Sequence, residues 1–286
     1  MGSFSILNDI SALTSQNLLT LNSQNLTKTL QRLSSGKRIN SGADDAAGLQ
    51  IADSLRANIR ALNQAARNAQ DGIGVAQIAD GALDQISMIL TRAVTLAEES
   101  ANGTVDSAGR VSLQAEFTEI QAEVARIATQ TNFNGVGIFT TSGINGSLSL
   151  FVGDTSGASS ISVTISTITT SGNTVTNLGG TNLAGVNMAT QAGAVSALTS
   201  IRDTLGAVSS NRASIGAGMN RLQSAVAVIT STSQNSQAAE STIRDANVAE
   251  EVANLTKFQI LAQSGLAALT QANSIHQMVL NLFQGM

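Results

Sequence analysis

Few residues of this chain could take part in catalysis, and they are poorly placed for it. The single histidine, His276, lies in an apolar stretch near the C-terminus, where we expect a packed imidazole and not a general base. The chain has no cysteine nucleophile, and one histidine is too few for the usual zinc site. We therefore expect no catalytic centre, no metal and no cofactor.

Two short sequences resemble phosphate-binding loops but lack the required spacing. The GIG sequence at 72–74 has no third glycine and lies within a helical pattern, and SSGKR at 34–38 lacks the upstream glycine. Adjacent carboxylates such as Asp44 and Asp45 would point about 100° apart on a helix, which does not suit paired acid–base work. Their position favours a helix N-terminus, with Ser41 or Asp44 as the cap. The sequence thus predicts a protein that is not an enzyme.

Composition indicates long helices. The 286 residues include no proline, whereas average usage of about 5% would give roughly 14. Because proline breaks helix interiors, its absence fits long uninterrupted helices. A net charge of −4 leaves no basic footprint for nucleic acid. The N-terminus carries no cationic leader and no apolar run approaches 18 residues, so we expect neither a cleaved signal peptide nor membrane insertion.

Apolar residues at alternating spacings of three and four predict three long helices. The first such seam covers 52–97 and is interrupted only at Asp80 and Ser87. The second covers 113–127, and the third covers 198–229. Helices with matching seams can bury one another in coiled-coil style, so we expect a rod-shaped helical bundle.

The segment between the second and third seams changes in character. Residues 141–190 are rich in Ser, Thr and Gly and carry almost no charge. Ile161, Val163 and Ile165 alternate with polar residues, which is the pattern of a half-buried strand. We expect a β-hairpin or small sheet here. The predicted fold class is mainly α, with a small β-hairpin region in the middle.

Both ends of the chain repeat the coiled-coil pattern and carry surplus apolar residues. Leu19, Leu26 and Leu33 recur every seven residues near the start, and a matching frame runs from 248 to 283. The last helix is apolar on a second stripe as well, which one partner helix cannot cover. We expect the first and last helices to pair, and other copies of the chain to cover the rest. The residues predicted to mediate polymerisation are Leu19, Leu26, Leu33, Val248, Leu255, Leu266, Leu269, Ile275, Leu280, Leu282 and Phe283.

Three motifs in order resemble the bacterial flagellins. They are LQRLSSGKRINSGADDAAG at 30–48, QTNFNG at 130–135 and STIRDANVAEEVANLTKFQIL at 241–261. The resemblance covers about 4–140 and 195–286. It implies a structural subunit that self-assembles into the helical bacterial flagellar filament for motility. It also implies secretion by the flagellar type III export apparatus and location in the extracellular filament.

The resemblance implies a division of the chain into three parts. Residues 1–42 and 245–286 would form a terminal polymerisation coiled coil, the inner tube of the filament. Residues 43–140 and 191–244 would form the helical rod domain, and 141–190 a small outer elaboration. The implied partners are further copies in a homopolymer, an export chaperone on the C-terminal helix, and the filament cap and hook-junction proteins.

The family's rod surface includes a patch that a Toll-like receptor of hosts recognises. Its motif falls on Arg92, Leu96 and Glu116, and Arg92 and Leu96 are four residues apart, so we expect them on one helix face. We expect the primary role of these residues to be packing and ion pairing between subunits.

Two alternative functions remain open from the sequence. A hook–filament junction protein would have similar ends, but the continuous match in the central helices disfavours it. A membrane-inserting helical translocator would explain the two-faced C-terminal helix. Neither end of the chain is apolar enough to prefer lipid over protein.

Overall fold

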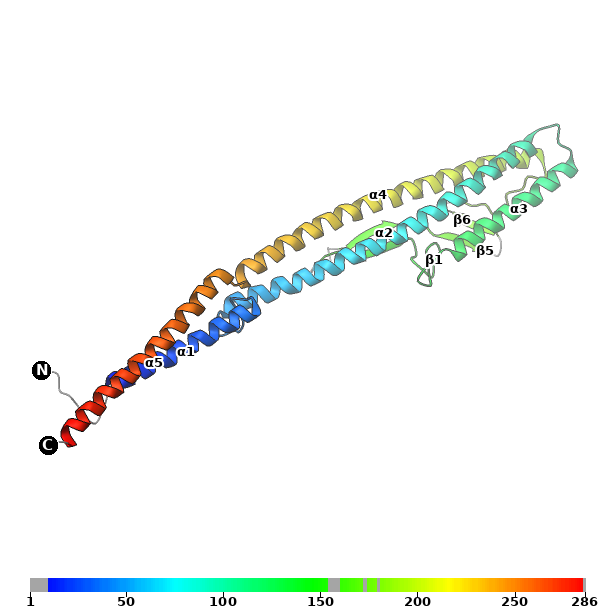
Figure 1. The fold of residues 1–286 in the computed structure, drawn as a ribbon. Coiled ribbons are helices and arrows are strands. Elements are labelled where there is room, and N and C mark those ends of the chain that lie inside the picture. Colours follow the sequence, from blue (N-terminus) through cyan, green and yellow to red (C-terminus); the bar gives the residue numbers. More distant parts are fainter. Residues whose placement is uncertain (1–9, 154–159, 172–173, 179–180, 285–286) are drawn as a thin grey trace. The chain divides into compact units, whose positions relative to one another are not determined.

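The computed structural model describes residues 10–153, 160–171, 174–178 and 181–284, and the chain forms two compact units. The first unit comprises Met1–Ala57 and Asn235–Met286, and the second comprises Asn58–Gln234. The expected mainly helical fold is confirmed (Figure 1). The helices of the described residues are α1 (Ile10–Ser35), α2 (Ala46–Ala101), α3 (Ser107–Gln130), α4 (Gln191–Arg244) and α5 (Val248–Gln284).

The expected β region is present as antiparallel strand pairs in the second unit. Val163 and Ile165 are buried and Ile161 is half-buried, as their alternation predicts. One strand pair, within residues 130–137, was not predicted. Its turn is formed by Asn134 and Gly135, which both have positive φ, as a two-residue Asn-Gly hairpin turn requires. The pairs are β1 (Asn132–Phe133) with β2 (Val136–Gly137), β3 (Ser147–Phe151) with β4 (Ser160–Thr164), and β5 (Ile168–Ser171) with β6 (Thr174–Leu178).

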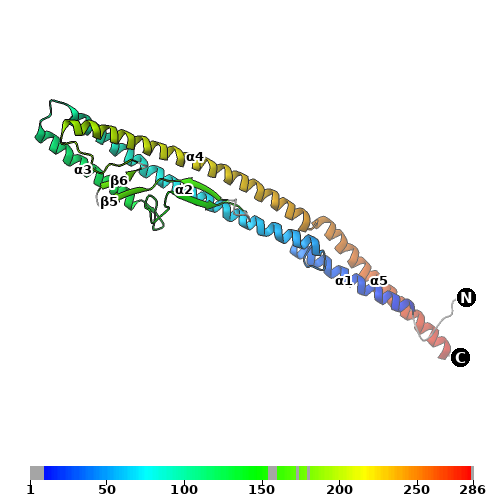
Figure 2. The same ribbon diagram turned by 180° about the vertical axis from the view of Figure 1, so that it is seen from behind.

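Helix α2 is buried along two seams, of which the sequence predicted one. Every position of the predicted 52–97 seam is buried or half-buried. A second seam recurs every seven residues and is made mainly of small residues: Ala65, Gly72, Ala79, Ile86, Ala93 and Ser100. In both views α2 has α4 on one side, and α3 lies on the other side along the last part of α2 (Figures 1 and 2), while Gly72 of the second seam packs against Leu150 of β3.

Asp80 interrupts the apolar seam of α2, and Arg212 interrupts the apolar seam at 198–229, which lies in α4. The two side chains face each other. The Arg212 Nε donates to an Asp80 oxygen at 2.9 Å, and its Nη1 donates to an Asp84 oxygen at 2.7 Å. The hydrogen bond to Asp80, with smaller help from the charges of both carboxylates, raises the pKa of Arg212 above its usual value. Charged residues at seam positions pair in only one alignment, so this pair favours a single register of α4 against α2.

Two helical glycines provide space for the β3–β4 hairpin. A Cβ added at Gly72 of α2 would lie 2.0 Å from the Leu150 Cδ1, and one added at Gly218 of α4 would lie 2.7 Å from the Val163 Cγ1. The strands therefore pack directly on the backbone of both helices. Val163 is buried and β-branched, so it has little freedom to move away.

We expect Gly218→Val to destabilise the second unit more than Gly216→Val. Both changes place a β-branched residue in the same helix, but no atom lies within 4 Å of a Cβ added at Gly216. The difference, which reports overpacking against Val163, should be about 1–3 kcal/mol in the free energy of unfolding. Urea unfolding of the two variants measures it, and equal losses would show that the hairpin does not rest on Gly218.

Candidate self-assembly surface

The terminal helices α1 and α5 pair with each other, as predicted. They run antiparallel, side by side, in the first unit (Figures 1 and 2). The Asn22 side-chain amide donates to the Phe258 carbonyl at 2.9 Å, and the Arg32 Nη1 lies 3.4 Å from a Glu251 oxygen. These two contacts join the helices at separate points along their length and so define their register.

In the part of the structure that is described, this helix pair buries no apolar side chain. Among the described side chains of α1 and α5, the only buried ones are polar, Thr29 and Glu251. The buried apolar side chains of the first unit, again among described residues, are Ile39 and Ala52, which lie outside both helices. Most hydrophobic stabilisation comes from fully buried side chains, so the pair gains little of it as a single copy.

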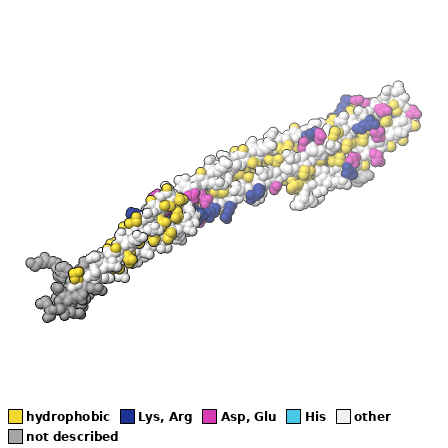
Figure 3. All heavy atoms as spheres, viewed as in Figure 1, with side chains coloured by type: hydrophobic (Ala, Val, Ile, Leu, Met, Phe, Trp, Pro, Cys, Tyr) yellow, Lys and Arg dark blue, Asp and Glu magenta, His cyan; other side chains and the backbone are white. Residues whose placement is uncertain are grey.

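Large apolar side chains remain exposed on the pair. Ile10 is 71% exposed, and Ile260 and Leu266 are 57% and 56% exposed. Hydrophobic side chains gather over α1 and α5 on the face shown in Figure 3. A patch of this extent on a helix pair is typical of an interaction surface. Among the described side chains, the large exposed apolar residues of the two helices are Ile10, Leu13, Leu18, Leu21, Leu30, Val248, Val252, Ile260, Leu261, Leu266 and Met278.

The residues predicted for polymerisation fall into three groups in the structure. The half-buried ones are Leu19, Leu26, Leu33, Leu255 and Leu269. The exposed ones are Val248 and Leu266. The remaining four, Ile275, Leu280, Leu282 and Phe283, belong to α5, but their side chains lie outside the described part of the structure. Exposed residues off the heptad frame, such as Leu18, Leu21 and Ile260, were missed, because the prediction left the frame only near the C-terminus, at Ile275 and Leu282.

The surface carries almost no charge. Residues 10–27 and 258–284 contain no Asp, Glu, Lys or Arg. Their polar residues are hydroxyls, amides and His276. Association through these segments therefore depends on apolar burial and neutral hydrogen bonds, which salt screens far less than it screens ion pairs.

A groove of about 490 Å³ lies between α1 and α5. The groove is lined by three leucines that are about half-exposed, Leu18, Leu21 and Leu261. The less exposed Leu19 and Phe258 line it as well. We call this feature the terminal groove. Its other lining residues are small or neutral: Ser15, Asn22, Asn25, Ser264, Gly265 and Ala268.

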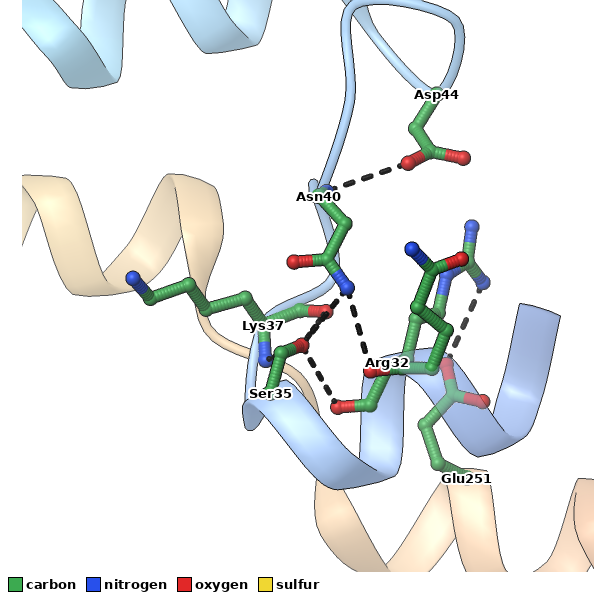
Figure 4. A network of polar contacts seen from close by, with 7 residues as sticks. Arg32, Ser35, Lys37, Asn40, Asp44 and Glu251 are labelled. Atoms are coloured by element: carbon green, nitrogen blue, oxygen red, sulfur yellow. Dashed lines mark hydrogen bonds and ion pairs between the residues drawn. The ribbon is translucent and has the colours of Figure 1, made fainter.

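The two connectors of the first unit bind each other next to the helix pair. The Arg38 amide donates to the Arg244 carbonyl at 2.7 Å, and the Ala246 amide donates to the Gly36 carbonyl at 3.0 Å. The Asn40 side chain donates to the Gln31 carbonyl and to the Ser35 hydroxyl (Figure 4). The two backbone bonds hold the end of α1 next to the start of α5, and the Asn40 bonds fix the first connector against α1.

The cap of α2 differs from the prediction. Asp45, and not Ser41 or Asp44, accepts the Gly48 amide at 2.8 Å in front of the first turn. One Asp44 oxygen instead accepts the Asn40 amide at 3.2 Å, and the Ser41 amide and hydroxyl at 3.1 Å each. Hydrogen bonds from the Ser41 and Asn40 amides lower the pKa of Asp44 below its usual value of 3.8. Asp44 therefore orders the connector, and Asp45 starts the helix.

We expect the hydrogen bonds from Asn40 and Ser41 to the Asp44 carboxylate to weaken in acid. The substitution Asp44→Asn should remove this pH response. A carboxyl group whose pKa is lowered by folding stabilises the fold above its unfolded pKa, and this stabilisation is lost as the pH falls through the lowered pKa. The amide chemical shifts of Asn40 and Ser41 should thus move together below about pH 4. NMR titration of the chain, of Asp44→Asn and of a control, Asp71→Asn, tests this. An unchanged acid response in Asp44→Asn would refute the role of Asp44.

The structure separates the three residues predicted for receptor recognition. Arg92 and Glu116 are exposed and joined within the chain, with the Arg92 Nη2 2.8 Å from a Glu116 oxygen. Leu96 is fully buried in the core of the second unit. Leu96 is therefore buried although Arg92, four residues before it, is exposed, because Leu96 lies between the second-seam residues Ala93 and Ser100 on the same side of α2.

Comparison with known proteins agrees with this architecture. Residues 6–144 match the bacterial flagellin N-terminal helical region, and residues 188–283 match the bacterial flagellin C-terminal helical region. The flagellar filament 31.3 kDa core protein of Treponema maltophilum is 36% identical over 287 residues, which cover 98% of this chain and 99% of that protein. A flagellin of Halalkalibacterium halodurans is 38% identical over 261 residues, covering 90% of this chain and 91% of that one.

One solved structure shows the fold. It is that of a flagellar hook-associated protein from Vibrio parahaemolyticus, with a TM-score of 0.58 and 15% identity, covering 71% of this chain and 100% of that chain. At this identity the likeness concerns the fold alone. In the described part of this chain, no helix is long and apolar enough to cross a membrane, and no three metal-binding side chains cluster.

Paired end helices with an unburied apolar surface define a structural, self-associating helical protein. The chain belongs to the bacterial flagellin family. It is a structural subunit, not an enzyme, and it self-assembles as a homopolymer into the flagellar filament, outside the cell. Nothing in the matches favours a junction protein or a membrane translocator.

Proposed function

We propose that the α1–α5 pair is the surface through which one subunit joins the next. One observation carries this proposal: the described parts of both helices bury no apolar side chain, yet expose many large ones. Residues 1–42 and 245–286 would then form the inner tube. Residues 43–140 and 191–244 would form the surrounding layer, and 141–190 would face outward.

The same surface accounts for the proposed partners of the free chain. Before assembly, an unpaired α5 would expose Leu255 and Leu269 in addition to the already exposed Leu266. A chaperone that covers the C-terminal helix would shield these side chains until the chain is secreted, largely unfolded, by the flagellar type III export apparatus. The filament cap and hook-junction proteins would meet this surface at the two ends of the polymer.

Hydrogen exchange of monomer and filament tests the proposed surface. Amides of α1 and α5 should exchange fast in the monomer and become protected by at least about a hundredfold in the filament, since a helix pair without a core opens easily. Amides in the core of the second unit, around Leu90 and Ile201, serve as the internal control and should change much less. Equal protection of α1 and α5 in both states would refute the proposal.

We also propose that the Arg92–Glu116 pair is recognised by a Toll-like receptor of hosts. Both side chains are about half-exposed, which leaves hydrogen-bonding atoms available to a partner. In a receptor reporter assay, Arg92→Ala and Glu116→Ala monomers should each signal less than the unmodified chain. The control is Arg126→Ala, which breaks an exposed ion pair with Glu123 on α3. Full signalling by both variants would remove this role.

A further inference from the structure

We infer that Met278 of α5 is an oxidation site, at which peroxide-type oxidants convert the thioether to the sulfoxide and thereby hinder assembly of the chain. The inference rests on the proposed function and adds a chemical control to the same surface. It concerns the state of one side chain before the subunit joins a polymer.

The composition of the chain leaves methionine as the main target of such oxidants. Thiols and thioethers are the side chains that two-electron oxidants such as hydrogen peroxide attack most readily. The chain has six methionines but no cysteine, and it has no tryptophan or tyrosine. The outcome of oxidation therefore depends on which methionine sulfurs an oxidant can reach.

The four described methionines differ widely in exposure. Met278 is 70% exposed, and Met88 of α2 is 53% exposed. Met219 of α4 is half-buried. Met188 is fully buried in the main apolar cluster, where its amide donates to the Gln114 Oε1 at 2.6 Å. Exposure thus predicts that Met278 reacts first and Met188 last.

The reaction needs no reagent besides the oxidant. The Met278 sulfur attacks one peroxide oxygen, so that a sulfur–oxygen bond forms and the O–O bond breaks. The sulfur loses two electrons, which the peroxide gains. The proton on the transferred oxygen passes to the departing hydroxide, which leaves as water. Methionine sulfoxide reductases reverse the change, and two thiols supply the electrons.

The position of Met278 makes its oxidation relevant to assembly. Met278 is one of the exposed apolar side chains of α5, and residues 258–284 contain no Asp, Glu, Lys or Arg. The sulfoxide adds a strongly polar oxygen that accepts hydrogen bonds, and burying this oxygen without a donor is unfavourable. Met88 is also exposed but lies in the second unit, outside the α1–α5 pair. Its oxidation should leave assembly through that pair unchanged.

Peptide mass spectrometry after brief treatment with hydrogen peroxide tests the site itself. In the monomer, sulfoxide should form at Met278 about tenfold faster than at Met188, because Met188 reacts only when the second unit opens locally. In the filament, Met278 should react more slowly than in the monomer, because the next subunit covers it. Oxidation of Met278 no faster than that of Met188, or equally fast in monomer and filament, would overturn the inference.

Seeded elongation tests the consequence. The critical concentration of peroxide-treated monomer should rise about tenfold, as expected for one buried polar group without a partner, and methionine sulfoxide reductases should restore it. Met278→Leu keeps the apolar character, size and helix propensity but has no sulfur, so peroxide should not change its elongation. The matched control, Met88→Leu, should lose elongation on treatment as the unmodified chain does. Equal losses in treated Met278→Leu and in the treated unmodified chain would overturn the inference.

Met278→Gln shows the effect of a polar group at this position without any oxidant. Glutamine is unbranched like methionine and has a similar helix propensity, so α5 should persist. The untreated variant should require a higher critical concentration than Met278→Leu. Equal critical concentrations of the two untreated variants would contradict the proposed effect of the sulfoxide.

Failure of this inference can be told apart from failure of the proposed assembly surface. The substitutions Ile260→Gln and Leu266→Gln test the surface as a whole, since neither residue contains sulfur. If they block elongation while oxidation of Met278 does not, only the inference about Met278 falls. If neither change hinders elongation, the proposed surface falls as well.

Discussion

A chain that carries both Ile260→Gln and Leu266→Gln should fold normally but elongate filament seeds only at a much higher concentration. The two side chains are 57% and 56% exposed, so about half of each is still available for burial between subunits. Burying a whole side chain of this kind yields about 1.5–3 kcal/mol, which makes the loss about 1–1.5 kcal/mol for each residue. Together these losses correspond to a critical concentration raised roughly tenfold to hundredfold.

Glutamine suits this test because its helix propensity is close to that of leucine, so α5 should persist. The matched control is Val195→Gln with Val228→Gln, at positions of α4 that are 55% and 65% exposed in the second unit. Sedimentation of polymer from monomer at a series of concentrations gives the critical concentration. Normal elongation of the α5 double variant would show that the terminal pair is not the assembly surface.

Phe117→Ala should have the largest effect on the stability of the second unit. Phe117 of α3 is fully buried in the main apolar cluster, which also contains Leu90 and Ile201. Truncation of a buried phenylalanine removes its transfer free energy and leaves a cavity, at a cost of about 3–5 kcal/mol. For a unit of this size the melting temperature should fall by roughly 6–20 °C.

The control for this change is Val111→Ala on the same helix, where the side chain is 60% exposed and the loss should stay within about 0.5 kcal/mol. Calorimetry of the monomer measures both variants. A similar small loss in both would show that α3 does not depend on Phe117 for its packing.

The sequence predicted the features of the fold that depend on periodicity. The 3/4 spacing identified α2, α3 and α4, and the period of two identified the strand that contains Val163. The pairing of the first and last helices was also predicted, because each repeats the same heptad frame. The repeats themselves are encoded by residues close together in the chain, which a single sequence shows directly, and the pairing followed from the likeness of two such repeats.

Features that depend on distant partners were not predictable. The second seam of α2 was missed because small residues such as Ala79 and Ala93 carry no strong apolar signal. Leu96 was included in the receptor patch through the family resemblance, which does not show that this position is buried. The packing of the irregular segment before α4 against α2 and α3 was missed as well. The Gln121 side chain of α3 donates to the Leu183 carbonyl, and the Ser100 hydroxyl of α2 donates to the Met188 carbonyl. Only the folded chain brings such groups together.

The exposed apolar surface of the terminal helix pair was predicted in kind but not in detail. The surplus of leucine at both ends indicated that other copies must cover it. The terminal groove was not predicted, because it requires Gly265 and Leu19 to meet across two helices, and nothing in either local sequence indicates that they do.

The first unit is assembled from the two extremities of the polypeptide, and this has a consequence for the order in which the molecule matures. The carbonyl that Asn22 binds belongs to Phe258, 236 positions later. When a polypeptide emerges with its amino end first, the second unit, Asn58–Gln234, can fold before α5 has emerged. At that stage α1 has no partner helix. A product that stops short of residue 248 would retain its entire second unit but lack α5, so the half-buried side chains of Leu19, Leu26 and Leu33 would become more exposed to water.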